Sequence, residues 1–242
     1  MSDDGHFGED VAKVYDQSHG GNDPSLIRKT VDCLADLSEG GDVLEFAIGT
    51  GRIAIPLVER GVRVKGIELS NAMVRRLREK KNGASIEVEI GDMTSTHVAG
   101  DFSLVVLVFN TIDNLATQES QIDCFKNASK HLRTGGRFLI ETQLPPIQKI
   151  PFGETQRAFA CNRDHFGIDV FDIATQEYTS NHVWMTEEGC THQSIPFRYA
   201  WPSELDLMAM MVGLALEFRW SDWNRSPFDR LSTKHISVWR KT

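Results

Sequence analysis

The sequence has few cysteines, no long hydrophobic run and no excess of basic residues, and each shortage argues against a class of protein. Its four cysteines form no Cys-x-x-Cys pair, so neither a disulfide framework nor a zinc site is expected. No run of about 18 apolar residues occurs, which argues against a membrane span. The net charge of −8 argues against nucleic acid as a partner, because phosphate binding favours a basic surface.

The N-terminus lacks the pattern of a targeting segment. Its first ten residues, MSDDGHFGED, are acidic and contain no apolar core of a secretory signal, so a cytoplasmic location is expected. Residues 1–22 are polar and glycine-containing, and they are predicted to form a mobile lid over the site. The length of 242 residues suffices for one large α/β domain with a small insertion.

Residues 42–68 hold the most informative pattern in the chain. A short apolar run, Val43–Phe46, predicts a buried strand, and a turn containing Gly49 and Gly51 follows it. An apolar segment of helical length comes next, and then a β-branched strand that stops at Glu68. Glycines let the backbone approach a ligand closely, and a carboxylate can accept hydrogen bonds from a ribose diol. The unit therefore predicts a binding site for a nucleoside-bearing cofactor.

Strand and helix patterns alternate along most of the chain. Further strands are predicted at 86–90, 102–109, 138–141, 215–220 and 235–240, and helices at 24–37, 71–82, 117–131 and 203–212. Residues 132–136 are expected to form a turn. Five strands that alternate with helices, followed by a terminal strand pair, predict an α/β fold with a doubly wound, seven-stranded, mostly parallel sheet.

One region departs from this alternation. Residues 147–200 show aromatic and β-branched residues in alternation but no good helix, which predicts a small antiparallel sheet. The expected division is a main domain of 23–146 and 202–242 with an insertion of 147–201. The insertion is expected to contribute either to an acceptor pocket or to a homodimer contact.

Two sets of residues carry a resemblance to a known family. The segment EFAIGTGR at 45–52, followed by Glu68, resembles the cofactor-binding signature of class I S-adenosylmethionine-dependent methyltransferases. Gly91-Asp92-Met93, the segment 132–136 and the terminal strand pair match the rest of that fold, which is Rossmann-like. In detail the chain resembles small-molecule members, such as the amino-sugar and the glycine/sarcosine N-methyltransferases. Those carry a Tyr-Asp near the N-terminus, here Tyr15-Asp16, and an antiparallel insertion after the fifth strand.

The resemblance implies S-adenosyl-L-methionine (SAM) as the cofactor and S-adenosyl-L-homocysteine (SAH) as its product. It implies that Glu45 lies near the cofactor's amino group, that Glu68 binds both ribose hydroxyls, and that Asp92 accepts a hydrogen bond from the adenine amine. The other residues that it implies for cofactor binding are Tyr15, Ala47, Gly49, Gly51, Leu69, Met93, Phe109 and Asn110. Ala47 departs from the pattern, because the family's commonest loop has glycine there.

Candidates for catalysis and acceptor binding are less well defined. Asp113 follows the fourth strand directly, which predicts a position near the reacting methyl group. Alternation with period two puts Tyr178, His182 and Trp184 on one face of a strand in the insertion, so Tyr178 and His182 are further catalytic candidates and Trp184 a substrate contact. The same face is equally compatible with a dimer surface. A free amine needs no dedicated base, whereas a hydroxyl or carbon nucleophile does.

Two more residues of the insertion are candidate substrate contacts, His192 and Arg198. Arg198 lies in an apolar stretch where an unpaired charge would be costly. It is expected to pair with Glu204 or Asp206, or to meet a substrate carboxylate. No metal site is expected, since no carboxylate or second histidine stands at ligand spacing on a predicted helix.

Three functions follow from these features. The first is a SAM-dependent methyltransferase that acts on a nitrogen, oxygen or carbon of a soluble small molecule, with secondary metabolism as one setting. The second is an NAD(P)-dependent oxidoreductase, because Gly49-x-Gly51-x-x-Ala54 also fits a dinucleotide fingerprint, although no Tyr-x-x-x-Lys is found. The third is a non-catalytic SAM-binding protein. The sequence does not identify the acceptor, since one fold serves many substrates.

Overall fold

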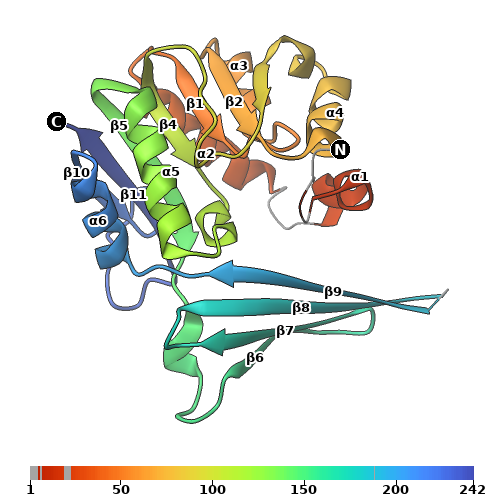
Figure 1. The fold of residues 1–242 in the computed structure, drawn as a ribbon. Helices are drawn as coiled ribbons and strands as arrows, with labels where there is room; N and C mark the ends of the chain where they lie inside the picture. Colours follow the sequence, from red (N-terminus) through yellow and green to blue (C-terminus); the bar gives the residue numbers. More distant parts are fainter. Residues whose placement is uncertain (1–4, 6, 19–22, 188) are drawn as a thin grey trace.

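The computed structural model describes residues 5, 7–18, 23–187 and 189–242. Figure 1 shows a main domain, in which helices cover a twisted sheet, and a second sheet that extends beneath it from the end of β5. In the part of the chain that is described, no helix is long and apolar enough to cross a membrane.

The main sheet has seven strands in the order β10-β11-β5-β4-β1-β2-β3. The strands β1 (Val43–Phe46), β2 (Val64–Glu68), β3 (Glu87–Ile90), β4 (Phe102–Leu107) and β5 (Leu132–Gln143) are parallel to one another. Strand β11 (Lys234–Lys241) pairs antiparallel with β5 on one side and with β10 (Leu214–Trp220) on the other. Every residue of β1 and β4 is buried, as expected for central strands covered on both faces. The predicted doubly wound sheet is confirmed.

Among the described residues, six α-helices and three short 3₁₀ helices complete the fold. They are α1 (Glu9–Ser18), α2 (Pro24–Ser38), α3 (Ala54–Glu59), α4 (Asn71–Glu79), α5 (Gln118–His131), α6 (Pro202–Met211), η1 (Gly83–Ser85), η2 (Thr111–Asn114) and η3 (Pro146–Lys149). One core lies between the sheet and α5 and α6, and a second lies between the sheet and α2, α3 and α4. Side-chain caps fix several helix starts. Asp23 accepts from the Ser25 amide, and Thr117 forms a capping box with Ser120.

The insertion forms a separate antiparallel sheet in the order β6-β7-β8-β9, as predicted. Its strands are β6 (Gln156–Cys161), β7 (His165–Asp172), β8 (Glu177–Thr186) and β9 (Gly189–Arg198). Directly opposed residues of antiparallel strands share a face. The pairs Phe171↔Tyr178, Asp169↔Ser180 and Gly167↔His182 therefore define one face, which we call the Tyr178 face.

The structure corrects two predictions about local structure and adds one helix. Residues 9–18, part of the predicted mobile lid, form helix α1, in which Ala12 packs with Met73 of α4 and Tyr15 joins that cluster. The rest of the predicted lid, residues 1–4, 6 and 19–22, lies outside the described residues. Residues 132–136 belong to β5 instead of a turn. Leu132 already pairs with Phe102, and a register shift in the pairing with β4 accommodates the residues between Leu132 and Arg137. Helix α4 ends at Glu79, three residues earlier than predicted.

Candidate functional site

The carboxyl ends of the parallel strands surround a cavity of about 250 Å³. Its lining includes seven of the residues that the sequence implied for cofactor binding, namely Tyr15, Ala47, Gly49, Glu68, Leu69, Asp92 and Met93. The structure thus brings together residues from α1 and from the loops after β1, β2 and β3. Phe7, Met73, Gly91, Thr111, Asn114 and Leu115 also line this cavity, and the sequence analysis assigned none of them a role in the site.

Glu68 organises the loop at the base of this cavity. Its side chain is buried, and its two oxygens accept hydrogen bonds from the backbone N–H groups of Gly49 (2.8 Å) and Ser70 (2.9 Å). Glu68 therefore fixes the glycine loop and presents a carboxylate to the cavity lined by that loop.

The loop backbone shows what the departure at Ala47 costs. Ala47 has a φ of +52° and Gly49 a φ of +57°, both in the left-handed region that favours glycine. A non-glycine residue held there costs on the order of 1–3 kcal/mol. Gly51 is also left-handed, but it lines neither this cavity nor the smaller one beside it. A Cβ on Gly51 would stand 2.5 Å from Leu77 Cδ1, so this glycine serves the packing of α4 against the loop.

A smaller cavity of about 30 Å³ continues from the first and shares Tyr15, Ala47, Gly49 and Thr111 with it. Glu45 lies there at the end of β1, is 3% exposed, and has one carboxylate oxygen, Oε2, without a hydrogen-bond partner. Burial raises the pKa of Glu45 to about 8. A buried acceptor of this kind fits a ligand that brings its own donor.

Arg52 adds a cation beside Glu45. Its guanidinium carbon lies 3.6 Å from the ring centroid of Phe109 and 5.6 Å from that of Tyr15. Glu45 and Arg52 line the same small cavity, which therefore offers a carboxyl group and a cation together. Such a pair suits the ammonium and carboxylate of an amino acid. Arg52 is the last residue of the recognised 45–52 segment, but the sequence analysis gave it no role.

Helix α5 holds the loop that carries Asp92 and Met93. The Asn127 side-chain amide donates to the carbonyl oxygens of Met93 (2.9 Å) and Thr96 (3.0 Å). The Val98 N–H donates to Nε2 of His131 over 2.8 Å. This part of the cavity wall is therefore anchored to a buried helix.

The turn after β4 is strained and well supported. Phe109 and Asn110 have φ values of +59° and +58°, an unfavourable conformation for two consecutive side-chain-bearing residues. The Phe109 N–H donates to Glu141 (3.2 Å), and Asn110 Oδ1 accepts from the Gln143 N–H (2.7 Å). Phe109 lines the small cavity, whereas Asn110 lines neither cavity and bonds back to β5. Strain maintained in this way is frequent at functional sites.

The structure brings together Asp113 and Tyr178, which lie 65 positions apart in the chain. Asp113 is 1% exposed and accepts hydrogen bonds from Tyr178 Oη (3.1 Å) and Thr142 Oγ1 (3.2 Å). Burial raises the pKa of Asp113 to about 7 and also raises the pKa of Tyr178. Asp113 lines neither the cavity of about 250 Å³ nor the smaller one of about 30 Å³. The pair joins the turn after β4 to the insertion.

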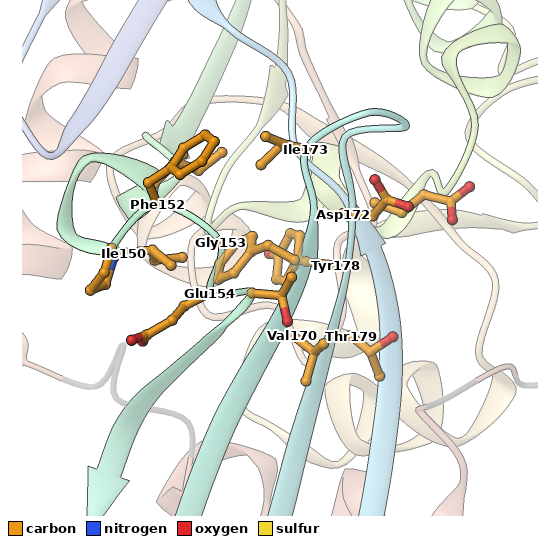
Figure 2. A pocket seen from close by; sticks show the side chains of 14 residues that line it. Ile150, Phe152, Gly153, Glu154, Val170, Asp172, Ile173, Tyr178 and Thr179 are labelled. Carbon is orange, nitrogen blue, oxygen red and sulfur yellow. The ribbon is translucent and has the colours of Figure 1, made fainter.

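A larger cavity, about 660 Å³, lies within the insertion and away from the glycine loop. Figure 2 shows Tyr178 inside it, with Ile150, Phe152 and Glu154 of the preceding loop on one side and Ile173 on the other. Phe152 is fully exposed, so the cavity is open to solvent. Tyr178 is the link between this cavity and Asp113.

The other catalytic candidate, His182, lies farther along the Tyr178 face. Its Nδ1 is 3.0 Å from His165 Nε2, and its Nε2 is 3.2 Å from Ser180 Oγ. Its ring is parallel to those of His165 and Trp184 within 9°. The predicted sharing of one face by Tyr178, His182 and Trp184 agrees with the strand pairing.

Arg198 and His192 occupy different surroundings. Arg198 is buried and bonds to Glu204 (2.7 Å) and Gln121 Oε1 (2.6 Å), which realises the predicted pairing with Glu204. Asp206 instead pairs with Arg219. His192 is exposed and opposes Val183, so it lies on the face opposite to Tyr178.

Comparisons with known proteins agree with this geometry. A family model described as a methyltransferase domain matches residues 43–136. The chain is 31% identical over 136 residues to a putative methyltransferase of Bacillus subtilis, covering 54% of this chain and 53% of that one. It is 28% identical over 137 residues to dTDP-3-amino-3,4,6-trideoxy-alpha-D-glucopyranose N,N-dimethyltransferase of Streptomyces venezuelae, covering 54% and 56%. The chain thus spans about half the length of these two curated relatives.

A solved structure extends the likeness to the whole chain. The CcbJ methyltransferase from Streptomyces caelestis is 33% identical, with a TM-score of 0.87 and 99% of both chains covered. The insertion and the terminal strands are therefore included in this likeness.

Proposed function

From the premise that this chain belongs to the S-adenosylmethionine-dependent methyltransferases, we propose that it transfers the methyl group of SAM to a nucleophile on a soluble small molecule. The observation that carries the proposal is the pair of carboxylates at adjacent strand ends. Glu68 stands at the tip of β2 in the larger cavity, and Glu45, with its unpartnered oxygen, stands at the tip of β1 in the smaller one.

Residues of both cavities fit the parts of SAM. Glu68 would accept the ribose hydroxyls, and Leu69, Asp92 and Met93 would surround the adenine. Glu45 would accept from the ammonium of the methionine part, and Arg52 would face its carboxylate. Tyr15 lines both cavities and would cover the junction between the two parts. Asn110 and Gly51 would act indirectly, by shaping the loops that contact the cofactor.

The bound cofactor supplies an electrophilic methyl group, so the protein's task is to position the acceptor and exclude water. Orientation of a nucleophile at about 3–3.5 Å can supply roughly 7–11 kcal/mol. Thr111 and Asn114 line the cavity from the turn after β4, beside buried Asp113. Asp113 and Tyr178 would hold this turn against the insertion, and the Tyr178 face with His182 and Trp184 would contact the acceptor.

The relatives favour an amine as the acceptor. The Streptomyces venezuelae relative is named an N,N-dimethyltransferase of an amino sugar, and the fold is shared with an amino pentose methyltransferase from Micromonospora echinaspora. A free amine is itself nucleophilic and requires no dedicated base. Among the described residues, the ionisable side chains that line the cavity of about 250 Å³ are Glu68, Asp92 and Tyr15, each of which is assigned to the cofactor. A lining without a further acid or base suits an amine acceptor. The cytoplasmic location and the homodimer stay predictions from the sequence.

Calorimetric titration with SAH and, separately, with NADH and NADPH tests the proposal. We expect SAH to bind and the nicotinamide cofactors not to bind. Incubation with labelled SAM and a panel of amino sugars and related amines should then yield a methylated product. Binding of a nicotinamide cofactor in place of SAH would contradict the proposal. SAH binding without a product from any amine, hydroxyl or carbon acceptor would favour a non-catalytic SAM-binding protein.

Cofactor binding is expected to release a proton from Glu45. Burial raises the pKa of Glu45 to about 8, so the free protein holds this carboxyl protonated at pH 7. An ammonium group beside it favours the ionised form and lowers its pKa. SAH affinity should therefore rise between pH 6 and 8, by up to about tenfold per pH unit. Calorimetry at pH 7 in buffers of different ionisation enthalpy should detect the release of up to one proton.

Glu45→Gln should remove this proton release, whereas Glu89→Gln, at an exposed position on β3, should keep it. Equal proton release from wild type and Glu45→Gln would show that another group titrates. This measurement of proton release requires SAH alone and no methyl acceptor.

A further inference from the structure

A fourth cavity, of about 430 Å³, lies between the main domain and the insertion. It is lined by Gln143 at the end of β5, by Lys149 of η3, by Arg157 of β6 and by Arg230 in the connection from β10 to β11. Helix η3 contributes to this cavity and to the cavity of Figure 2, so it stands between the two.

The charged residues that line this cavity are all basic. Lys149, Arg157 and Arg230 line it, and none of its lining residues is acidic. Within the described residues, none of these three cations forms an ion pair, although Arg157 attracts Asp169 across the β6–β7 ladder. Lys149 and Arg230 are exposed and Arg157 is half-buried, whereas the buried arginines Arg137 and Arg198 are paired with carboxylates.

These three cations line one cavity in a chain of net charge −8. Like charges around a shared cavity repel one another, and 34 acidic residues were available to neutralise them. An anion in the cavity would replace that repulsion with attraction. Arginine and lysine are the side chains that recognise phosphate and carboxylate groups, arginine with a planar fork and lysine as a point charge.

The cavity is connected to the methyl-transfer site through Gln143. The Gln143 N–H donates to Asn110 in the strained turn after β4, and its side-chain amide donates to Tyr178 Oη over 3.3 Å. Thr111, next to Asn110, lines both of the cavities that we assign to SAM, of about 250 and 30 Å³. Arg157 opposes Asp169, and Asp169 opposes Ser180, so Arg157 lies on the Tyr178 face.

We propose that this basic cavity binds an anionic group of the methyl acceptor, a phosphate or a carboxylate. The inference rests on the proposed function and deepens it, because it makes the acceptor an anionic small molecule. The anionic end would lie among Lys149, Arg157 and Arg230, and the nucleophile would extend past Gln143 and Tyr178 toward the cofactor.

The test uses the SAH-loaded protein, and SAH binding is measured first for every variant. Inorganic pyrophosphate and malonate are then titrated as probes for the two kinds of anion. At least one should bind, and its affinity should fall as the salt concentration rises. Arg157→Gln and Arg230→Gln should each weaken it about tenfold, the effect of losing one charge-assisted contact. The control Arg163→Gln, at an exposed site between β6 and β7, should leave it unchanged.

A second measurement ties the anion to the acceptor. Glucosamine 6-phosphate should bind the SAH-loaded protein at least tenfold more tightly than glucosamine, and the Arg157→Gln/Arg230→Gln double variant should lose this preference. Equal or absent binding of the two sugars, or anion binding that the substitutions leave unchanged, would overturn the inference. If SAH binds normally in these experiments, such a failure concerns the basic cavity alone; if SAH does not bind, the proposed function itself fails.

Discussion

Glu68→Ala is expected to weaken SAH binding by roughly 100-fold or more. The alanine would remove the acceptor of two ribose hydroxyl bonds, and a hydrogen bond to a charged group contributes about 1.5–3 kcal/mol. It would also leave the backbone N–H groups of Gly49 and Ser70 without their present partner and so loosen the glycine loop. Calorimetric titration with SAH measures the loss, and thermal unfolding without ligand shows whether the variant is folded.

Two further variants separate the causes. Glu68→Gln keeps one carbonyl acceptor for the loop but loses the charge, so it should bind SAH more weakly than wild type and more tightly than Glu68→Ala. Glu89→Ala removes an exposed glutamate from the neighbouring strand β3 and should change nothing. SAH binding by Glu68→Ala with wild-type affinity would mean that the cofactor does not use the tip of β2.

The second large effect concerns protein stability and Asp113. Burial raises its pKa from an ordinary 3.8 to about 7, so the folded protein retains a proton that the unfolded chain releases. The stabilisation is complete below pH 3.8 and is lost as the pH rises through about 7. Between pH 5 and 8 the wild type should lose roughly 2–3 kcal/mol of unfolding free energy from this group. Urea unfolding of Asp113→Asn, which does not titrate, should lack this loss.

Asp123→Asn, at an exposed position on α5, is the matched control and should follow the wild-type pH dependence. Tyr178→Phe tests the partner, because it removes a hydrogen bond from buried Asp113 and should cost about 1–3 kcal/mol. Tyr199→Phe, in the same aromatic cluster but without a bond to Asp113, should cost less. Parallel pH curves for wild type and Asp113→Asn would contradict the role assigned to this carboxyl.

The residues at strand ends were predictable for a simple geometric reason. The carboxyl ends of parallel strands meet at one edge of a sheet, so Glu68 at the end of β2 and Asp92 after β3 had to lie near each other once the strands were identified. The bounds of β1 were predicted as observed, and β4 begins at the predicted residue but ends two residues earlier, at Leu107. Glu45 was implied by the family resemblance, but its unpartnered oxygen became visible only in the structure.

Other parts of the site depend on contacts between distant segments. Helix α1 is polar and short, and only its packing against α4 accounts for its order. Arg52 could not be assigned from its position, because its place beside Glu45 and Phe109 depends on how the loop turns. Pairing with β8 puts His192 on the face opposite to Tyr178, and of the two carboxylates predicted for Arg198 only the fold selects Glu204.

The sequence by itself determined the order of strands and helices, the glycine loop and the carboxylates at the strand tips, because these follow from periodicities and dihedral preferences within a few residues. The tertiary structure alone decided that Asp113 meets Tyr178, that Arg52 lies beside Glu45, and that three cations from separate elements line one cavity. Those contacts join segments that are far apart in the chain, and their formation depends on packing over the whole fold.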